Sequence, residues 1–463
     1  MILMYKISFG TSGWRDKMNS GFNDENVLRA AYGIGIYLKK KSSHSKVIVG
    51  YDTRKNSRHF AELICGIFGG FGLETFIIDS PTPTPVVSFA VLNTKASAGI
   101  AVTASHNPPI YNGIKFLDSS GATPVKETTD QITALIPEKR INPLPCSAES
   151  ITIKDAYLDA LGRRFDLGKI RGMHVAIDTM HGAGRGYLAD LLVRYGADVH
   201  ELNENYDAEF GGKQPIPSEE NLQELKDLVK RTGSVIGIAN DGDADRFAAV
   251  DADGNYYTAN QSGLMMCDYL FKYRNEKGDV ARSIHTTSAM DRLCATYGVK
   301  CTEVPVGFKN ISKELAHGAV FGLEGASQGA GFGGWIPDKD GIAAGALICE
   351  MLSVEKQSFA DIWKSVSKKF GFGCFLAFDI NKTESVVANL NKLKGMSIGD
   401  NFAGRKTVKL SLLDGIKLYL NDGSWVLVRE SGTEPLVRAF AEANSKSDAE
   451  KLVEESKRFL SGK

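Results

Sequence analysis

A repeated order of strand, helix and strand constrains the fold of this 463-residue chain more than any other feature. A strand of the buried type at 47–52 is followed by a helical pattern over 60–71 and by further strands at 75–78 and 98–102. The same order returns twice, at 174–178, 187–195 and 235–239 and then at 281–285, 289–297 and 319–321. Continuous apolar strands that alternate with helices form sheets covered on both faces. The sequence therefore predicts three related α/β units.

The last strand of each unit leads into a loop of unusual composition. These loops begin with Thr-Ala-Ser at 103–105, Asp-Gly-Asp at 241–243 and Glu-Gly-Ala-Ser at 324–327. In α/β sheets, ligands bind beyond the strand ends, where such loops are exposed. We therefore expect each unit to contribute one loop with a chemical role.

The rest of the chain, after about residue 370, follows a different pattern. It combines a strand at 375–380, a helix over 386–393, a hairpin of 416–420 with 425–428 around an Asn-Asp-Gly-Ser turn, and a final helix over 447–459. This pattern predicts a smaller α+β domain on an antiparallel sheet. A chain of this length exceeds a single core, and the three prolines within 137–145 mark the best linker. We expect four domains, at 1–150, 151–256, 257–370 and 371–463.

Composition excludes several classes of partner. The 55 basic residues balance 55 acidic ones, so no global field attracts nucleic acid or an anionic membrane. No stretch is long and apolar enough to span a bilayer. The seven cysteines form no Cys-x-x-Cys pair, which is typical of reduced thiols, and the first ten residues lack an export signal. We expect a cytoplasmic monomer or homodimer that binds neither nucleic acid nor membrane.

The first loop offers a hydroxyl group at the edge of a sheet. Ser105 follows a strand and lies among small residues, and Pro108 and Pro109 prevent a regular continuation. The simpler alternative is an ordinary turn in which Asn107 bonds its own backbone. A hydrolase triad fits less well, because no Gly-x-Ser-x-Gly elbow surrounds Ser105.

The second loop offers carboxylates for a hard cation. Asp241, Asp243 and Asp245 recur at every second residue, and a cage of oxygen ligands completed by phosphate and water suits Mg²⁺. A calcium loop or an acidic turn is the alternative. An EF-hand is disfavoured because Ala249 and Ala252 occupy positions at which its ligands belong. The adjacent residue, Arg246, could orient these carboxylates or contact a phosphate.

A third segment, near the C-terminus, offers donors for an anion. Its candidate phosphate-binding residues are Arg429, Ser431, Gly432, Thr433 and Arg438. Exposed amides, hydroxyls and guanidinium groups bind a phosphate dianion by charge-assisted hydrogen bonds, although a surface turn with scattered charges is the alternative. The glycine-rich run at 182–186 might suggest a dinucleotide site, but the third glycine of that fingerprint falls on Tyr187. We interpret it as a tight strand-to-helix turn.

These segments closely resemble the α-D-phosphohexomutase superfamily, especially its phosphoglucomutase/phosphomannomutase branch. Residues 103–109 resemble its phosphoserine loop, 241–246 its magnesium loop and 431–435 its phosphate loop. The motifs at 9–15 and 338–342 match as well, so the resemblance covers essentially the whole chain. It implies three related α/β domains with mixed sheets and a C-terminal α+β domain around a central cleft.

The resemblance also implies a mechanism. Ser105 would carry a phosphoryl group and pass it to a hexose monophosphate, with glucose 1,6-bisphosphate as intermediate and activator and one Mg²⁺ per chain. Ser105 would also be a ligand of that metal. Lys115 resembles the general acid/base, a role that requires neighbouring cations to lower its pKa. Arg15 resembles the arginine that approaches the phosphoserine, and His106 belongs to the same catalytic set.

The sugar-binding segments depart from the pattern of the superfamily. Lys309 lies in a segment that resembles the sugar-contacting loop of the third domain. The superfamily's Gly-Glu-x-Ser-Gly motif grips the sugar hydroxyls, but here Glu324 and Ser327 are three residues apart instead of two. Glu430 replaces a proline that is common among relatives. We expect a mutase that acts on glucose or mannose phosphate, with glucose preferred because of the 338–342 segment. A phosphoglucosamine or phosphopentose mutase, or a phosphosugar-binding protein without turnover, is the alternative.

Overall fold

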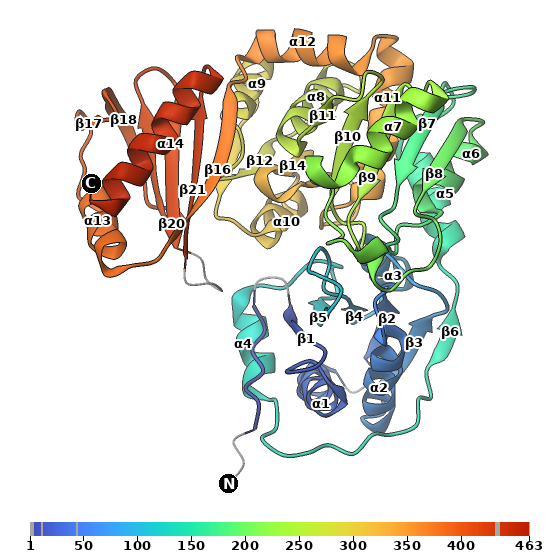
Figure 1. Cartoon of the computed structure of the whole chain (residues 1–463). Helices are drawn as coiled ribbons and strands as arrows, with labels where there is room; N and C mark the ends of the chain where they lie inside the picture. Colours follow the sequence, from blue (N-terminus) through green and yellow to red (C-terminus); the bar gives the residue numbers. More distant parts are fainter. Residues whose placement is uncertain (1–3, 11–12, 43–44, 431–435, 463) are drawn as a thin grey trace.

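The computed structural model describes residues 4–10, 13–42, 45–430 and 436–462 (Figure 1). The described residues form four main β-sheets in successive segments of the chain. The predicted series of three α/β domains with mixed sheets and a C-terminal α+β domain is confirmed. Among the helices of these residues, none combines the length and the apolar character needed to cross a membrane. The cytoplasmic location and the oligomeric state stay predictions.

Domain I is built on a six-stranded sheet in the order β1-β5-β4-β2-β3-β6. Alternate residues of its central strands face different helices, because Val47 and Val49 pack with α1 and α2, whereas Ile48 packs with α3. Its elements are β1 (Trp14–Lys17), α1 (Asp24–Lys41), β2 (Lys46–Tyr51), α2 (Ser57–Gly70), β3 (Glu74–Ile78), α3 (Thr84–Thr94), β4 (Ala98–Val102), β5 (Tyr111–Leu117), α4 (Lys126–Ala134) and β6 (Glu149–Ile151).

Domain II repeats this plan on a five-stranded sheet in the order β11-β10-β9-β7-β8. Helix α7 covers one face, and α6 with α11 of domain III covers the other. Its elements are α5 (Lys154–Arg164), β7 (His174–Asp178), α6 (Tyr187–Arg194), β8 (Asp198–Leu202), α7 (Gln223–Thr232), β9 (Ile236–Asn240), β10 (Phe247–Asp251) and β11 (Tyr256–Tyr257), with short 3₁₀ turns at Phe210–Gly212 and Glu219–Leu222.

Domain III has a four-stranded sheet in the order β13-β12-β14-β15, with α10 on one face and α8 on the other. Its elements are α8 (Ala259–Lys272), β12 (Val280–Ser283), α9 (Ala289–Tyr297), β13 (Cys301–Val304), α10 (Phe308–Ala316), β14 (Phe321–Glu324), a 3₁₀ turn (Gly325–Ser327), β15 (Gly329–Phe332), α11 (Gly341–Glu355) and α12 (Phe359–Phe370). The predicted strand at 319–321 is wrong by about three residues. Strand β14 continues to Glu324 because Glu324 pairs with Gly329 across the following turn.

The three sheets share one arrangement of strands and loops. In each, a central strand has a parallel neighbour on both sides, and one of these neighbours continues into an antiparallel strand. The connecting loops are β4–β5, β9–β10 and β14–β15, which contain Ser105, the three aspartates and Ser327, respectively. The three predicted loops, one from each unit, therefore occupy equivalent positions in the three domains.

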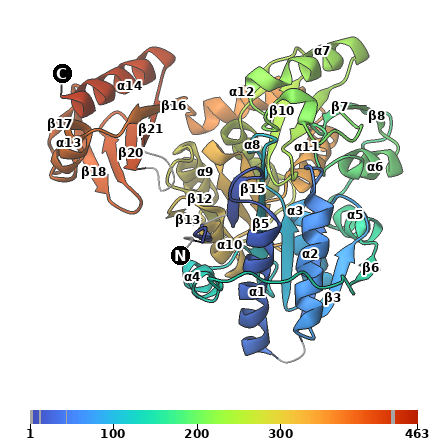
Figure 2. The ribbon, with the colours of Figure 1, turned by 60° about the horizontal axis from the view of Figure 1, so that its bottom comes forward.

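Domain IV forms an antiparallel sheet in the order β16-β21-β20-β19-β18-β17. Helices α13 and α14 cover one face, and the other face turns Trp425, Leu427 and Phe440 toward Ile284 of domain III. Figures 1 and 2 show this domain to one side of the other three. Its elements are β16 (Cys374–Asn381), α13 (Glu384–Lys394), β17 (Asn401–Phe402), β18 (Arg405–Ser411), β19 (Ile416–Leu420), β20 (Trp425–Glu430), β21 (Leu436–Ala443) and α14 (Lys446–Ser461).

The exact domain boundaries stay predictions. Two of them, at 150/151 and 256/257, fall within the short edge strands β6 and β11, which pair with the sheet that precedes them. Residues 137–145, the predicted linker, contain no helix or strand. They run along the outside of domain I toward β6 (Figure 1).

Candidate active site

The loop that carries Ser105 is held rigidly against the sheet of domain I. Ser105 is buried and has a φ of 52°, a left-handed conformation that is costly for a residue with a side chain. Arg54 fixes the loop by donating hydrogen bonds to the carbonyl oxygens of Ser105 (2.5 Å), Asn107 (2.6 Å), Pro108 (2.8 Å) and Tyr111 (3.0 Å). The Arg54 guanidinium is itself buried beside the Asp52 carboxylate, at 3.1 Å.

The metal loop of domain II lies directly against this serine. The Ser105 hydroxyl donates a hydrogen bond of 2.7 Å to Asp241 Oδ2. The backbones also approach closely, because a Cβ atom at Gly242 would lie 2.6 Å from the Ser105 carbonyl oxygen. Glycine at this position therefore permits the contact between the two loops.

The three predicted metal ligands form one buried group. Ligand oxygens of Asp241, Asp243 and Asp245 lie within 4.8 Å of one another. Burial, followed by the charges of Asp243 and Asp245, raises the pKa of Asp241. The Oδ1 atoms of Asp243 and Asp245 are buried without a hydrogen-bond partner among the described residues. Crowded carboxylates with unsatisfied oxygens, next to a serine hydroxyl, fit a hard divalent cation such as Mg²⁺.

The side chain of Lys115 lies against two carboxylates of this acidic group. Its ammonium group contacts Asp243 Oδ2, and it donates to Asp245 Oδ2 at 2.7 Å and to Thr84 Oγ1 at 3.3 Å. Burial acts to lower the pKa of Lys115, but Asp243 and Asp245 raise it above its ordinary value. The expectation that neighbouring cations lower this pKa is therefore not met, because carboxylates are the nearest charges.

Arg15, His106 and Arg246 surround the serine hydroxyl. Arg15, on β1, donates 2.8 Å to the side-chain oxygen of Asn107, and Arg246 Nε lies 3.6 Å from Asp241 Oδ2. His106 Nδ1 lies 3.4 Å from Ser105 Oγ. Burial, together with the charges of Arg246 and Arg15, lowers the pKa of His106, so its imidazole is neutral.

The β14–β15 turn absorbs the additional residue of the sugar-binding loop. Glu324 is buried and accepts a hydrogen bond of 2.6 Å from the Gly307 backbone, whereas Ser327 Oγ lies 3.5 Å from His285 Nε2. Gln328 anchors the turn to domain II by donating 2.7 Å to the Pro217 carbonyl oxygen. Lys309 lies in the first turn of α10, next to Phe308.

The predicted phosphate-binding residues belong to domain IV. Arg429 Nη2 lies 3.3 Å from Asp414 Oδ1, and Arg438 Nε lies 3.9 Å from Asp379 Oδ1. Glu430 forms an ion pair with Lys382. Ser431, Gly432 and Thr433 lie outside the described residues, so their predicted role stays a prediction.

Four residues that sequence reasoning did not assign also contribute to the site. Arg54 clamps the serine loop, Thr84 donates 2.6 Å to Asp243 Oδ2, Lys339 Nζ lies 3.3 Å from Asp245 Oδ2, and His285 faces Ser327. Arg54 follows strand β2 and could have been proposed from that position alone. The contacts of Thr84 and Lys339 have no local signal because they cross to domain II, although Lys339 belongs to the 338–342 motif. His285 and Ser327 lie in the same domain but 42 residues apart in the chain.

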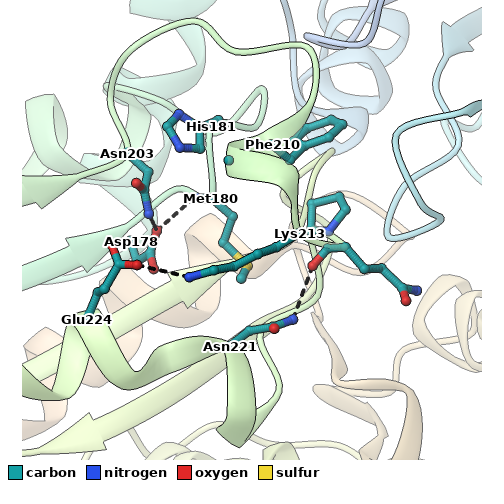
Figure 3. A pocket seen from close by; sticks show the side chains of 11 residues that line it. Asp178, Met180, His181, Asn203, Phe210, Lys213, Asn221 and Glu224 are labelled. Atoms are coloured by element: carbon teal, nitrogen blue, oxygen red, sulfur yellow. Dashed lines mark hydrogen bonds and ion pairs between the residues drawn. The ribbon is translucent and has the colours of Figure 1, made fainter.

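A separate pocket lies behind the metal loop. It has a volume of about 200 Å³ and is lined by domain II residues that include Asp178, His181, Lys213, Pro215 and Glu224. Figure 3 shows that its charged groups face one another: Lys213 bonds Glu224 at 2.9 Å, and Asp178 accepts 2.8 Å from Asn203. Pro215 joins the pocket to the metal loop by accepting a hydrogen bond from Gly242. The predicted site residues do not line this pocket.

Models of known protein families match nearly the whole chain. Models of the four phosphoglucomutase/phosphomannomutase domains match in order: α/β/α domain I at 6–142, domain II at 155–254, domain III at 258–370 and the C-terminal domain at 381–458. The chain belongs to the phosphoglucomutase/phosphomannomutase family. It is therefore a member of the α-D-phosphohexomutase superfamily and an enzyme of the phosphohexomutase type.

Individual members of this family differ in the substrate that their names give. A Thermococcus kodakarensis protein named phosphoglucomutase/phosphomannomutase is 30% identical over 457 residues, which are 96% of each chain. A Sulfurisphaera tokodaii protein named phosphoglucosamine/phosphogalactosamine mutase is 28% identical, covering 98% of this chain and 99% of its own. A Thermus thermophilus crystal structure titled "putative phosphomannomutase" superposes with a TM-score of 0.87 at 30% identity, covering 98% of this chain and 99% of its own.

Proposed function

We propose that this phosphohexomutase interconverts the 1- and 6-phosphates of glucose or mannose, with glucose as the preferred sugar, and that it depends on Mg²⁺. One observation carries the proposal: the Ser105 hydroxyl lies 2.7 Å from Asp241, within a buried group of three carboxylates. A reactive hydroxyl at a site for a hard cation is the arrangement that phosphoryl transfer requires.

Ser105 serves as a relay in the proposed reaction. The C1 and C6 oxygens of a hexose are too far apart for direct transfer. The phosphoryl group therefore leaves Ser105 Oγ for one sugar oxygen, and the bound 1,6-bisphosphate turns before the other phosphoryl group returns to Ser105. Mg²⁺ held by Asp241, Asp243 and Asp245 would supply charge stabilisation for the transferring group. Arg15 and Arg246 add positive charge on the same side.

The roles of the surrounding residues follow from this scheme. Each transfer moves a proton between a sugar hydroxyl and the protein. Lys115 is our candidate for that exchange, because a divalent cation bound by Asp243 and Asp245 would offset the carboxylate charges that raise its pKa. Glu324, Ser327 and Lys309 are proposed to bind the sugar. Arg429, Ser431, Gly432, Thr433 and Arg438 are proposed to hold the phosphate that is not transferred.

Phosphoglucosamine mutase is the second candidate. The name of the Sulfurisphaera tokodaii relative supports it. The turn at Gly325–Ser327, which accommodates the additional residue, also supports it, because this turn directly follows Glu324, a proposed sugar-binding residue. A phosphosugar-binding protein without turnover is the non-enzymatic alternative.

A direct assay separates these possibilities. Purified protein with Mg²⁺ and a trace of glucose 1,6-bisphosphate should convert glucose 1-phosphate to glucose 6-phosphate, and EDTA should abolish the conversion. Rates on glucose, mannose, glucosamine and ribose phosphates rank the substrates. A faster rate on glucosamine phosphate than on glucose phosphate would identify glucosamine as the preferred sugar. A thermal shift with every phosphosugar but conversion of none would instead support the binding protein.

A further inference from the structure

We propose that His174, Asp198 and His200 form a second metal site, selective for a divalent transition metal such as Zn²⁺, at the outer edge of domain II. Strands β7 and β8 are parallel neighbours, and their register places His174 beside Asp198. His200 lies two residues after Asp198, so its side chain leaves the same face of β8. The sheet therefore gathers two imidazoles and one carboxylate on one face.

The distances between these side chains are close to those of a metal centre. His174 Nδ1 lies 3.2 Å from Asp198 Oδ2, and His200 Nε2 lies 3.9 Å from Asp198 Oδ1. All three ligand atoms lie within 4.8 Å of one another. In a tetrahedral site, zinc–ligand bonds of about 2.0–2.2 Å place ligand atoms about 3.4 Å apart. The side chains are 34–54% exposed, so small rotations can close the remaining gap.

The ligand chemistry distinguishes this site from the carboxylate group of the metal loop. Imidazole nitrogens select Zn²⁺, Ni²⁺ or Cu²⁺, whereas a cage of oxygen atoms selects Mg²⁺. Three protein ligands leave a fourth position for water. Without a metal, the exposed contact between His174 and Asp198 contributes little to stability.

The position of the cluster separates it from catalysis. His174 begins β7, whereas the chain enters the metal loop from the opposite end of the neighbouring parallel strand β9. Strand β8 is the edge strand of this sheet (Figure 1). A metal at this site would link β8 to β7. Because the metal would bind only the folded sheet, it would stabilise domain II.

The test uses untagged full-length protein and Zn²⁺. Titration calorimetry with excess Mg²⁺ compares the wild type with His174→Ala, His200→Ala, Asp198→Asn and the double histidine variant. Retention on immobilised Ni²⁺ gives an independent readout that responds to imidazole. The matched control is His59→Ala, because His59 also contacts an exposed carboxylate, Asp24, at 3.0 Å, but belongs to no group of three metal-ligating side chains among the described residues.

The proposal predicts one Zn²⁺ per chain that the double variant does not bind. Each single histidine substitution should weaken this binding at least tenfold and reduce retention on Ni²⁺, and His59→Ala should change neither. Zn²⁺ should raise the melting temperature of the wild type more than that of the double variant, with Mg²⁺-dependent turnover unchanged by the substitutions. Equal Zn²⁺ binding by the wild type and the double variant would overturn the proposal. It would also be overturned if His59→Ala lost as much Zn²⁺ binding as the double variant.

Discussion

Ser105 combines a left-handed backbone, nearly complete burial and a hydroxyl that contacts Asp241. If this hydroxyl is the phosphoryl relay, Ser105→Ala should lower kcat by at least ~10³-fold, because no other group replaces the nucleophile. Binding of glucose 1-phosphate, measured by calorimetry, should remain within a fewfold of the wild-type value. Ser119→Ala, an exposed serine in the same domain, is the control. Near-normal turnover by Ser105→Ala would show that the relay lies elsewhere.

His285 makes stability depend on pH. Burial, with the charges of Arg429 and Lys417, lowers the pKa of this imidazole to about 3, whereas the unfolded value is about 6.5. The unfolded chain therefore binds more protons between these values, so the stability that is present above pH 6.5 is lost as the pH falls. Between pH 6.5 and 5 the loss is about 1–2 kcal/mol.

Calorimetry at several pH values tests this dependence. The melting temperature of the wild type should fall more steeply from pH 6.5 to pH 5 than that of His285→Gln, which has no titrating group at this position. His59→Gln, at an exposed histidine, should retain the wild-type slope. Parallel curves for the wild type and His285→Gln would contradict the prediction.

At the scale of elements, five strands of the first two domains were predicted from sequence within one residue, namely β2, β3, β4, β7 and β9, and the other strands of these domains were not predicted. Strands β4 and β7 are almost completely buried, so the apolar runs at 98–102 and 174–178 mark them directly. Strand β14 of domain III was misplaced because it extends to Glu324, a buried acid. The aspartate cluster was predictable from its spacing. The position of Lys115 within that cluster was not, since β5 and the metal loop belong to different domains.

The β4–β5 loop depends on a single guanidinium group. Arg54 bridges three of its carbonyl oxygens and that of Tyr111 at the start of β5, and lysine retains the charge but not the planar fork of donors. Arg54→Lys should therefore leave the chain folded and lower kcat by ~10–100-fold, because Ser105 loses its fixed position. Steady-state kinetics with glucose 1-phosphate check this loss. Arg58→Lys, which alters an exposed arginine of α2 paired with Glu62, should have normal kinetics. Unchanged kcat in Arg54→Lys would exclude a positioning role.

At the scale of the whole molecule, domains I to III and domain IV are held together differently. One hydrophobic cluster runs from Val87 in domain I through Leu188 in domain II to Phe332 in domain III. Domain IV has its own core and meets domain III across a small apolar cluster with buried polar contacts. Among these contacts, Lys417 donates to Glu303 at 2.8 Å and to the Ile284 carbonyl oxygen at 2.6 Å. Sequence reasoning identified the domains, but it could not pair these residues across them.

Glu442 is the buried acid on which this interface depends. Its carboxylate, 3% exposed, accepts hydrogen bonds from the Thr287 hydroxyl (2.5 Å), from the Ser288 backbone (2.9 Å) and hydroxyl (3.0 Å), and from the Trp425 indole (2.5 Å). Glu442→Ala leaves these donors without their partner, which should cost about 3 kcal/mol. Most of that cost should fall on the contact between domains III and IV.

Limited proteolysis measures this loosening. The connection at 371–373 joins α12 to β16, and Phe372 within it packs against Trp363. We expect chymotrypsin to cleave after Phe372 faster in Glu442→Ala than in the wild type, while the fragment that ends there stays folded. Glu450→Ala, on the exposed face of α14, should be cleaved at the wild-type rate. Equal cleavage of the two variants would mean that apolar packing alone, through Trp425 and Phe440 on Ile284, holds domain IV in place.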